Sequence, residues 1–161
     1  MRSFTIDAVR LLVHEVPNGQ DLNEEQRLGK RCVWCGCSAP VIDLGGISAR
    51  FRPQACAPCH ILHSALLTSY FDWATHVDDC ILCVQQRPCP TTDRLRRMHA
   101  AARRAVHGLD EDKRLVCFEC RKAVNLDHPA LPVLWLGEAA GAHLLFSHAG
   151  RCPGEVADVH G

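Results

Sequence analysis

The residues with the clearest chemistry in this chain are its cysteines, which recur in closely spaced pairs. Ten of the eleven cysteines can be divided, together with two histidines, into three sets of four. These sets are Cys32, Cys35, Cys56 and Cys59; His76, Cys80, Cys83 and Cys89; and Cys117, Cys120, His148 and Cys152. Two thiolates separated by two residues can bind one metal ion from a single tight turn, and two such pairs complete a tetrahedral sphere. The spacing therefore predicts three zinc ions, with only Cys37 left over.

Zinc is favoured over disulfide bonds by the odd number of cysteines and by the expected cellular compartment. The first twenty residues contain no unbroken apolar stretch of the length found in signal peptides. No later run approaches the roughly 18 apolar residues that span a bilayer. We therefore expect a cytoplasmic protein with no membrane partner, whose thiols stay reduced. Iron fits less well than zinc, because filled spheres of three thiolates and one imidazole favour zinc.

The composition predicts a thin hydrophobic core and gives no sign of a strongly charged partner. Only 6% of the 161 residues are aromatic, and the formal net charge is zero. Metal binding is therefore expected to supply a large part of the folding free energy, on the order of 10 kcal/mol per site. No overall basic excess indicates nucleic acid.

Two stretches near the N-terminus are predicted to be helical. Residues 4–16 have an amphipathic pattern that the turn-forming residues 17–19 end. Asn23, followed by two glutamates, predicts a short capped helix within residues 20–31. This second helix leads directly into the first pair of cysteines.

The first cysteine set predicts a zinc module over residues 32–59. It opens with a metal-binding turn (a knuckle), in which Gly36 permits the required backbone conformation. Strands at 41–44 and 47–51 are expected around a two-residue hairpin turn, and a helix over 60–76 follows. The expected buried residues of that helix are Ile61, Leu62, Ala65, Leu66 and Tyr70. Knuckle, hairpin and then helix is the order of a treble-clef finger.

The segment PQACAPCHILHS, taken with the upstream Cys32 pair, resembles the zinc-binding frame of HNH-type endonucleases over residues 32–63. That family needs a histidine at the hairpin as general base, whereas residues 36–55 contain none and Asp43 is their only carboxylate. The resemblance therefore implies the scaffold without the nuclease activity. His60 and His63 are interpreted as helix-face residues or as residues that support the ligands.

The second set contains an H-x3-C-x2-C motif at residues 76–83 that is similar to the signature of zinc-containing anti-sigma factors. In that family the zinc helix belongs to a bundle that clasps a sigma factor, and some members release zinc when their thiols oxidise. The fourth ligand is open between Cys89 and His63. Cys89 is preferred, because it lies in a rigid loop between two prolines.

A basic helix is predicted over residues 94–107, capped by 91–93 and ended by Gly108. Its apolar stripe would be Leu95, Met98, Ala102, Ala105 and Val106. Its candidate contact residues are Arg94, Arg96, Arg97, Arg103 and Arg104. Such a surface could bind the phosphates of a nucleic acid or the acidic face of a protein partner. The alternative is an ordinary solvated helix face.

The C-terminal part is expected to begin after a charged linker at residues 110–114. Strands at 131–136 and 142–147 would return the last two ligands to the Cys117 knuckle, an arrangement that resembles a zinc ribbon. His148 is preferred over His128 and His143 because of its spacing to Cys152.

Together these patterns predict a small, metal-stabilised α+β protein containing a treble-clef finger, zinc-bound helices and a C-terminal zinc ribbon. The expected divisions are an N-terminal helical segment (1–30), the treble-clef module with the second zinc site and basic helix (31–109), and the ribbon-like module (110–161). No enzyme or small-molecule substrate is predicted, because filled spheres leave zinc no open position and no deaminase pattern or phosphate-binding loop is present. The preferred function is a non-catalytic zinc-binding regulator that contacts nucleic acid. The alternatives are a protein-binding, anti-sigma-like or redox-responsive regulator, and a degenerate nuclease.

Overall fold

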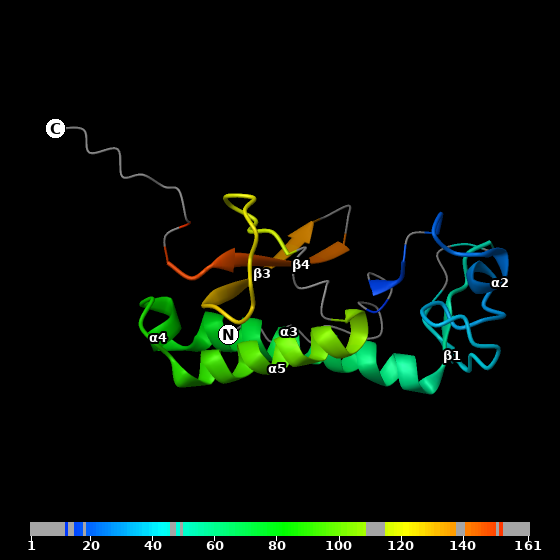
Figure 1. Ribbon diagram of the computed structural model, residues 1–161, viewed down its shortest axis with the longest axis horizontal. Helices are drawn as coiled ribbons and strands as arrows, with labels where there is room; N and C mark the ends of the chain where they lie inside the picture. Colours follow the sequence, from blue (N-terminus) through cyan, green and yellow to red (C-terminus); the bar gives the residue numbers. More distant parts are fainter. Residues whose placement is uncertain are drawn as a thin grey trace. The chain divides into compact units, whose positions relative to one another are not determined.

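Four helices and two small antiparallel sheets make up the described part of the chain (Figure 1). The computed structural model describes residues 12, 15–17, 19–45, 48, 50–108, 115–137, 141–150 and 152. The helices are α2 (Glu24–Arg27), α3 (Ala57–Asp79), α4 (Ile81–Val84) and α5 (Pro90–His107). The sheets are β1 (Ile42–Asp43) with β2 (Gln54–Ala55), and β3 (Ala130–Gly137) with β4 (Gly141–His148). The expectation of a small α+β protein is confirmed. Most of the predicted helix over 4–16, and all of the linker at 110–114, lie outside the described residues.

The chain divides into two compact units, residues 1–68 and 69–161, and the division falls inside α3. None of the described helices is both long and apolar enough to cross a membrane. The three segments expected from the sequence stay a prediction.

Helix α2 forms as the sequence predicts, and a capping box satisfies two of its N-terminal backbone N–H groups. The Asn23 side chain accepts from the Gln26 backbone N–H at 2.9 Å, and the Gln26 side chain accepts from the Asn23 N–H at 3.2 Å. The Gln26 amide also donates to the carbonyl oxygens of Cys32 and Val33, at 3.3 and 3.1 Å. Through these bonds α2 supports the first cysteine knuckle.

The first sheet differs from the predicted hairpin. Strand β1 pairs with residues 54–55, with Ile42 opposite Ala55, and not with the described residues of the expected second strand, 48, 50 and 51. Strand β2 has a second partner, since the Val33 N–H donates to the Gln54 carbonyl at 2.8 Å. The observed register brings the chain entering Cys56 directly beside the first knuckle.

The buried face of α3 is also different from the predicted one. Leu66 and Tyr70 are buried as expected, but Ile61 and Leu62 are 65% and 41% exposed, and Ala65 is exposed too. The inward face instead passes through His63, whose ring stacks on Trp34 with the centroids 3.8 Å apart and the planes 11° from parallel. Since this aromatic pair occupies the inward position, the two aliphatic side chains before it face solvent.

The second unit has a contiguous core between helices and hairpin. Helix α5 lies beside the C-terminal half of α3 (Figure 1), where the Ser69 hydroxyl and His99 Nδ1 are 3.0 Å apart. The Tyr70 hydroxyl donates to the Leu145 carbonyl at 2.8 Å, which attaches β4 to α3. The core residues are Tyr70, Trp73, Ala74, Ala100, Cys117, Val124, Leu126, Ala130, Phe146 and Cys152. Two predicted metal ligands, Cys117 and Cys152, therefore belong to this core.

Strands β3 and β4 confirm the predicted C-terminal hairpin, and they are slightly longer than expected. The ladder runs from Ala130 opposite His148 to Gly137 opposite Gly141. Helix α5 starts earlier than expected, with Cys89 as its N-cap and Pro90 in its first turn. A proline is well tolerated there, because the first helical N–H has no intrahelical partner.

Candidate metal centres

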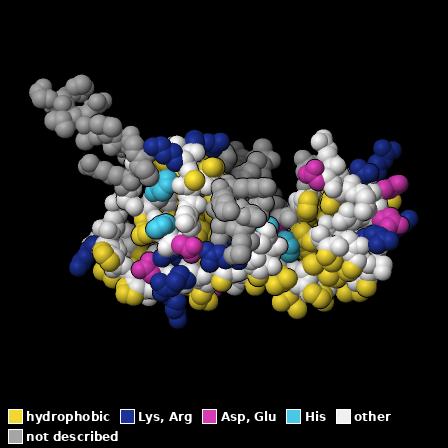
Figure 2. Space-filling view, in the orientation of Figure 1, with side chains coloured by type: hydrophobic (Ala, Val, Ile, Leu, Met, Phe, Trp, Pro, Cys, Tyr) yellow, Lys and Arg dark blue, Asp and Glu magenta, His cyan; other side chains and the backbone are white. Residues whose placement is uncertain are grey.

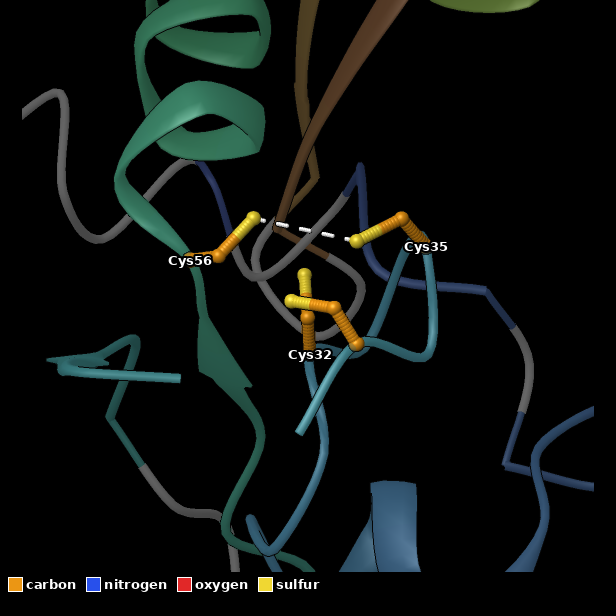
Figure 3. Close-up of side chains that lie close together, drawn as sticks. Cys32, Cys35 and Cys56 are labelled. Carbon is orange, nitrogen blue, oxygen red and sulfur yellow. Dashed lines mark hydrogen bonds between the residues drawn. The ribbon is translucent and has the colours of Figure 1, made fainter. Parts of the chain in front are cut away.

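Cysteine and histidine side chains gather into three groups, in each of which four ligand atoms lie within 4.8 Å of one another. The first centre is Cys32, Cys35, Cys37 and Cys56; the second is His76, Cys80, Cys83 and Cys89; the third is Cys117, Cys120, His148 and Cys152. All eleven cysteines are free of disulfide bonds. The four-atom groups contain every predicted ligand except Cys59, and the first group contains Cys37 in its place. Figure 3 shows the side chains of Cys32, Cys35 and Cys56 converging on a common point.

The sulfur separations match a shared tetrahedral ion. The Cys35 and Cys56 sulfurs are 3.7 Å apart, those of Cys80 and Cys89 are 3.9 Å apart, and those of Cys117 and Cys152 are 3.7 Å apart. Two thiolates bound to one zinc at about 2.3 Å, at the tetrahedral angle, lie about 3.8 Å apart. A disulfide needs about 2.05 Å. Each group can therefore bind a metal ion.

The first and third centres are built on the same knuckle. The N–H of Gly36 donates to the Cys32 carbonyl at 2.8 Å, and the N–H of Arg121 donates to the Cys117 carbonyl at 2.9 Å. Gly36 has φ +71° and Arg121 has φ +61°, so the residue after the second cysteine is left-handed in both turns.

Both knuckles are also anchored to a strand in the same way. Val33 donates its N–H to Gln54, and Phe118 donates its N–H to Phe146, both at 2.8 Å. In each case a ligand follows two residues after the acceptor, Cys56 in the first centre and His148 in the third. The strand therefore fixes where the second half of the ligand set meets the knuckle.

His148 is oriented for metal binding through one ring nitrogen. Its Nε2 lies 3.1 Å from the Ala123 carbonyl oxygen, to which a protonated Nε2 donates. Nδ1 then carries the free lone pair, and it lies 3.5 Å from the Cys120 sulfur. A carbonyl that fixes the tautomer of a ligating histidine is a common feature of zinc sites. Of the competing histidines, His128 is exposed, and nothing is described of the His143 side chain.

The second centre lies where three helices meet. His76 is in the last turn of α3, Cys80 is the N-cap of α4, and Cys89 is the N-cap of α5. His76 Nε2 is 3.3 Å from the Cys89 sulfur, and the Cys83 sulfur is 2.8 Å from the Thr92 hydroxyl. His63, the other candidate fourth ligand, is not among the four and instead stacks on Trp34.

One thiol in each centre has a pKa well below its ordinary value. Burial raises the pKa of Cys32, but hydrogen bonds from the backbone N–H groups of Cys35, Cys56 and Trp34 outweigh it and lower the pKa to about 6. Cys117 behaves in the same way, with a pKa of about 6.

In the second centre the corresponding thiol is Cys89. The backbone N–H of Thr92 and the His76 ring lower its pKa to about 6. Burial and the neighbouring thiols raise the pKa of Cys83 to about 11. Since zinc binds thiolates, the lowered pKa of Cys32, Cys89 and Cys117 favours metal binding at each centre.

The predicted arginine surface on α5 requires correction. Arg96 is only 5% exposed, because its guanidinium points inward and donates to the Leu126 carbonyl and, at 3.3 Å, to Asp93. Arg104 pairs with Asp127 at 2.8 Å. Met98, placed in the predicted apolar stripe, is 51% exposed. Arg94 and Arg97 remain exposed. On the face shown in Figure 2, Lys and Arg side chains lie in separate small groups and do not form one continuous basic surface.

Comparison with protein-family models, with curated proteins and with solved structures found no match to this chain. The HNH-like, anti-sigma-like and ribbon-like resemblances therefore depend on the sequence motifs alone.

Proposed function

We propose that this chain is a non-catalytic zinc-binding protein in which three zinc ions hold a small fold together and position a surface for a macromolecular partner. The observation that carries the proposal is the presence of four protein ligand atoms within 4.8 Å of one another in each of three centres. A catalytic zinc keeps one position open for water, whereas four protein ligands fill the sphere. Sulfur-rich sets of this kind select zinc over harder cations.

Within this proposal the first zinc module is a treble-clef finger and the C-terminal part is a zinc ribbon. Support for the first comes from the order of knuckle, β1–β2 pair and α3, whose first turn carries Cys59. Support for the second comes from the β3–β4 hairpin, which returns His148 to the Cys117 knuckle. Both modules would function in the reducing cytoplasm, where thiolates stay available to zinc.

A protein partner is favoured over a nucleic acid. On α4, beside the second centre, Ile81 and Val84 are 65% and 63% exposed. Exposed aliphatic side chains three residues apart on one helix suit an apolar protein surface. Of the basic surface that would suit phosphates, only Arg94 and Arg97 are fully exposed, because Arg96 is buried, Arg103 is half-buried and Arg104 is paired. This favours the alternative in which the chain binds a protein, as the anti-sigma factors do.

Chelation tests the structural role of the metal. Removing metal from the purified full chain should abolish its near-ultraviolet circular dichroism, and added zinc should restore it. Unchanged spectra after complete metal removal would refute the proposal.

Binding of labelled DNA and RNA at low ionic strength tests the choice of partner. We expect no binding that depends on Arg94 and Arg97. Strong, salt-sensitive binding that is abolished in the double variant Arg94→Glu, Arg97→Glu would show that the partner is a nucleic acid. Metal-dependent cleavage of the nucleic acid would restore the nuclease alternative.

A further inference from the structure

Five thiols lie in or beside the first centre, one more than a tetrahedral ion needs. The Cys37 sulfur lies within 4.8 Å of the sulfurs of Cys32, Cys35 and Cys56. The Cys59 thiol lies outside this four-atom group, but near enough to the thiols of Cys56, Cys35 and Cys32 to interact with them. Both Cys37 and Cys59 are therefore within reach of an ion held by the other three. The second and third centres have three cysteines and one histidine each, with no spare thiol.

The third centre shows that the knuckle itself does not require this extra thiol. The Cys32 N–H donates to the Cys37 carbonyl at 2.9 Å, and the Cys117 N–H donates to the Lys122 carbonyl at 2.8 Å. Cys37 and Lys122 thus hold the same position in two matching turns. Since a lysine serves equally well there, the thiol of Cys37 is not explained by the backbone geometry.

Two criteria select different fourth ligands for the first centre: the spacing along the chain favours Cys59, and the distance between sulfur atoms favours Cys37. Cys59 follows Cys56 by three residues, much as Cys152 follows His148 by four, so it is the counterpart of a ligand in the third centre. Cys37 is the residue whose sulfur completes the four-atom group. Both side chains are partly exposed, and they approach the centre from different elements, the knuckle and the first turn of α3.

We propose that Cys37 and Cys59 alternate as the fourth ligand of a zinc ion held permanently by Cys32, Cys35 and Cys56. The inference rests on the proposed function, in that the first centre binds zinc. In the exchange, the incoming thiol releases its proton and forms a zinc–sulfur bond. The outgoing zinc–sulfur bond breaks and its sulfur takes up a proton, so no oxidation occurs. Because Cys37 lies within 4.8 Å of the three permanent ligands and Cys59 lies near them, the incoming ligand can bind before the outgoing one leaves.

The consequence is a modification site. One thiol of this centre is free at any moment, and it is always Cys37 or Cys59. The other nine of the eleven cysteines are protected by metal. A thiol-directed electrophile should therefore modify a single sulfur per chain without displacing zinc.

Alkylation of the zinc-loaded full chain with iodoacetamide, followed by peptide mapping, tests this directly. A carbon–sulfur bond forms, iodide leaves, and the thiol proton goes to the buffer. We expect about one label per chain, the sum of partial labelling at Cys37 and Cys59, with all zinc retained. Complete labelling of both residues with the zinc retained, or label confined to one of them, would overturn the proposal.

Serine variants provide an independent readout. Cys37→Ser and Cys59→Ser should each keep the same zinc content as the wild type and should lose nearly all labelling. Cys35→Ser is the matched control, and it should lose the zinc of the first centre. Loss of that zinc in only one of the two single variants would mean that this residue is the fixed ligand, and alternation would be wrong.

The same experiments separate this inference from the proposed function. A wild-type chain that contains no zinc and is labelled on all its cysteines refutes the zinc-binding function. A chain that binds zinc but is labelled only on Cys37 refutes alternation and leaves the zinc-binding function standing.

Discussion

The sulfur atoms of Cys117 and Cys152 lie 3.7 Å apart, although 35 residues separate them in the chain. Both are buried in the core of the second unit. This distance is nearly twice the length of a disulfide bond, and it equals the edge of a zinc–thiolate tetrahedron to within about 0.1 Å. The core of this unit is therefore arranged around a position for a cation.

Replacing His148 should remove one zinc ion. His148→Ala leaves the third centre with three ligands, and we expect the second unit to lose several of the roughly 10 kcal/mol that a structural site supplies. His148→Cys should retain the metal, because four thiolates also form a stable structural site. His128→Ala is the control, since that side chain is exposed. Metal analysis with thermal unfolding would check this. Full zinc content in His148→Ala would contradict the ligand assignment.

Acidification should release zinc and destabilise the fold together. The thiols of Cys32, Cys89 and Cys117 have a pKa of about 6, below their ordinary 9.0. A lowered pKa stabilises the folded state fully above pH 9, less as the pH falls from 9 to 6, and not at all below 6. Zinc needs the same thiolates, so its affinity changes in the same direction. Zinc content and urea unfolding across this range would test the sign. A fold that becomes more stable on acidification would contradict it.

Gly29→Ala should destabilise the first unit more than Gly45→Ala. Both glycines have positive φ, +73° and +85°. A β-carbon at Gly29 would lie 2.5 Å from the Arg52 carbonyl oxygen, whereas one at Gly45 meets nothing within 4 Å. We expect a cost of about 1–2 kcal/mol at Gly45 from backbone strain alone. Overlap at Gly29 should add about 1–3 kcal/mol. Equal losses in denaturant unfolding would mean that the close approach to Arg52 is not as described.

Arg96→Ala should be far more costly than Arg97→Ala. Removing the buried guanidinium leaves the Leu126 carbonyl without this donor and opens a cavity, for about 2–4 kcal/mol. Arg97 is exposed, and its loss should change stability by no more than about 0.5 kcal/mol. Urea unfolding of the two variants provides the comparison. Similar, small effects of both would show that Arg96 does not hold α5 to the loop containing Leu126.

The ligand groups and the C-terminal hairpin could be predicted because each depends on a pattern of residues close together in the sequence. A pair of cysteines separated by two residues predicts a metal-binding turn by itself, and residues 131–147 form two apolar stretches on either side of a turn bounded by glycines. Cys37 was missed because it has no partner at the usual spacing. The Cys35-x-Cys37 repeat was the available signal.

The inward faces of α3 and α5 could not be predicted, for a different reason. Periodicity placed Ile61 and Leu62 inside and Arg96 outside. In the structure, His63 turns inward to meet Trp34, and Arg96 turns inward to a carbonyl thirty residues away in the chain. In both helices the buried face is set by a partner that is distant in the sequence. A local sequence pattern carries no information about such partners.

Native mass spectrometry of the intact chain, combined with elemental analysis, tests the central claim most directly. The account predicts one species carrying three zinc ions per chain, with all thiols reduced. A chain that carries no bound metal, or whose mass shows cysteines joined as disulfides, would contradict it.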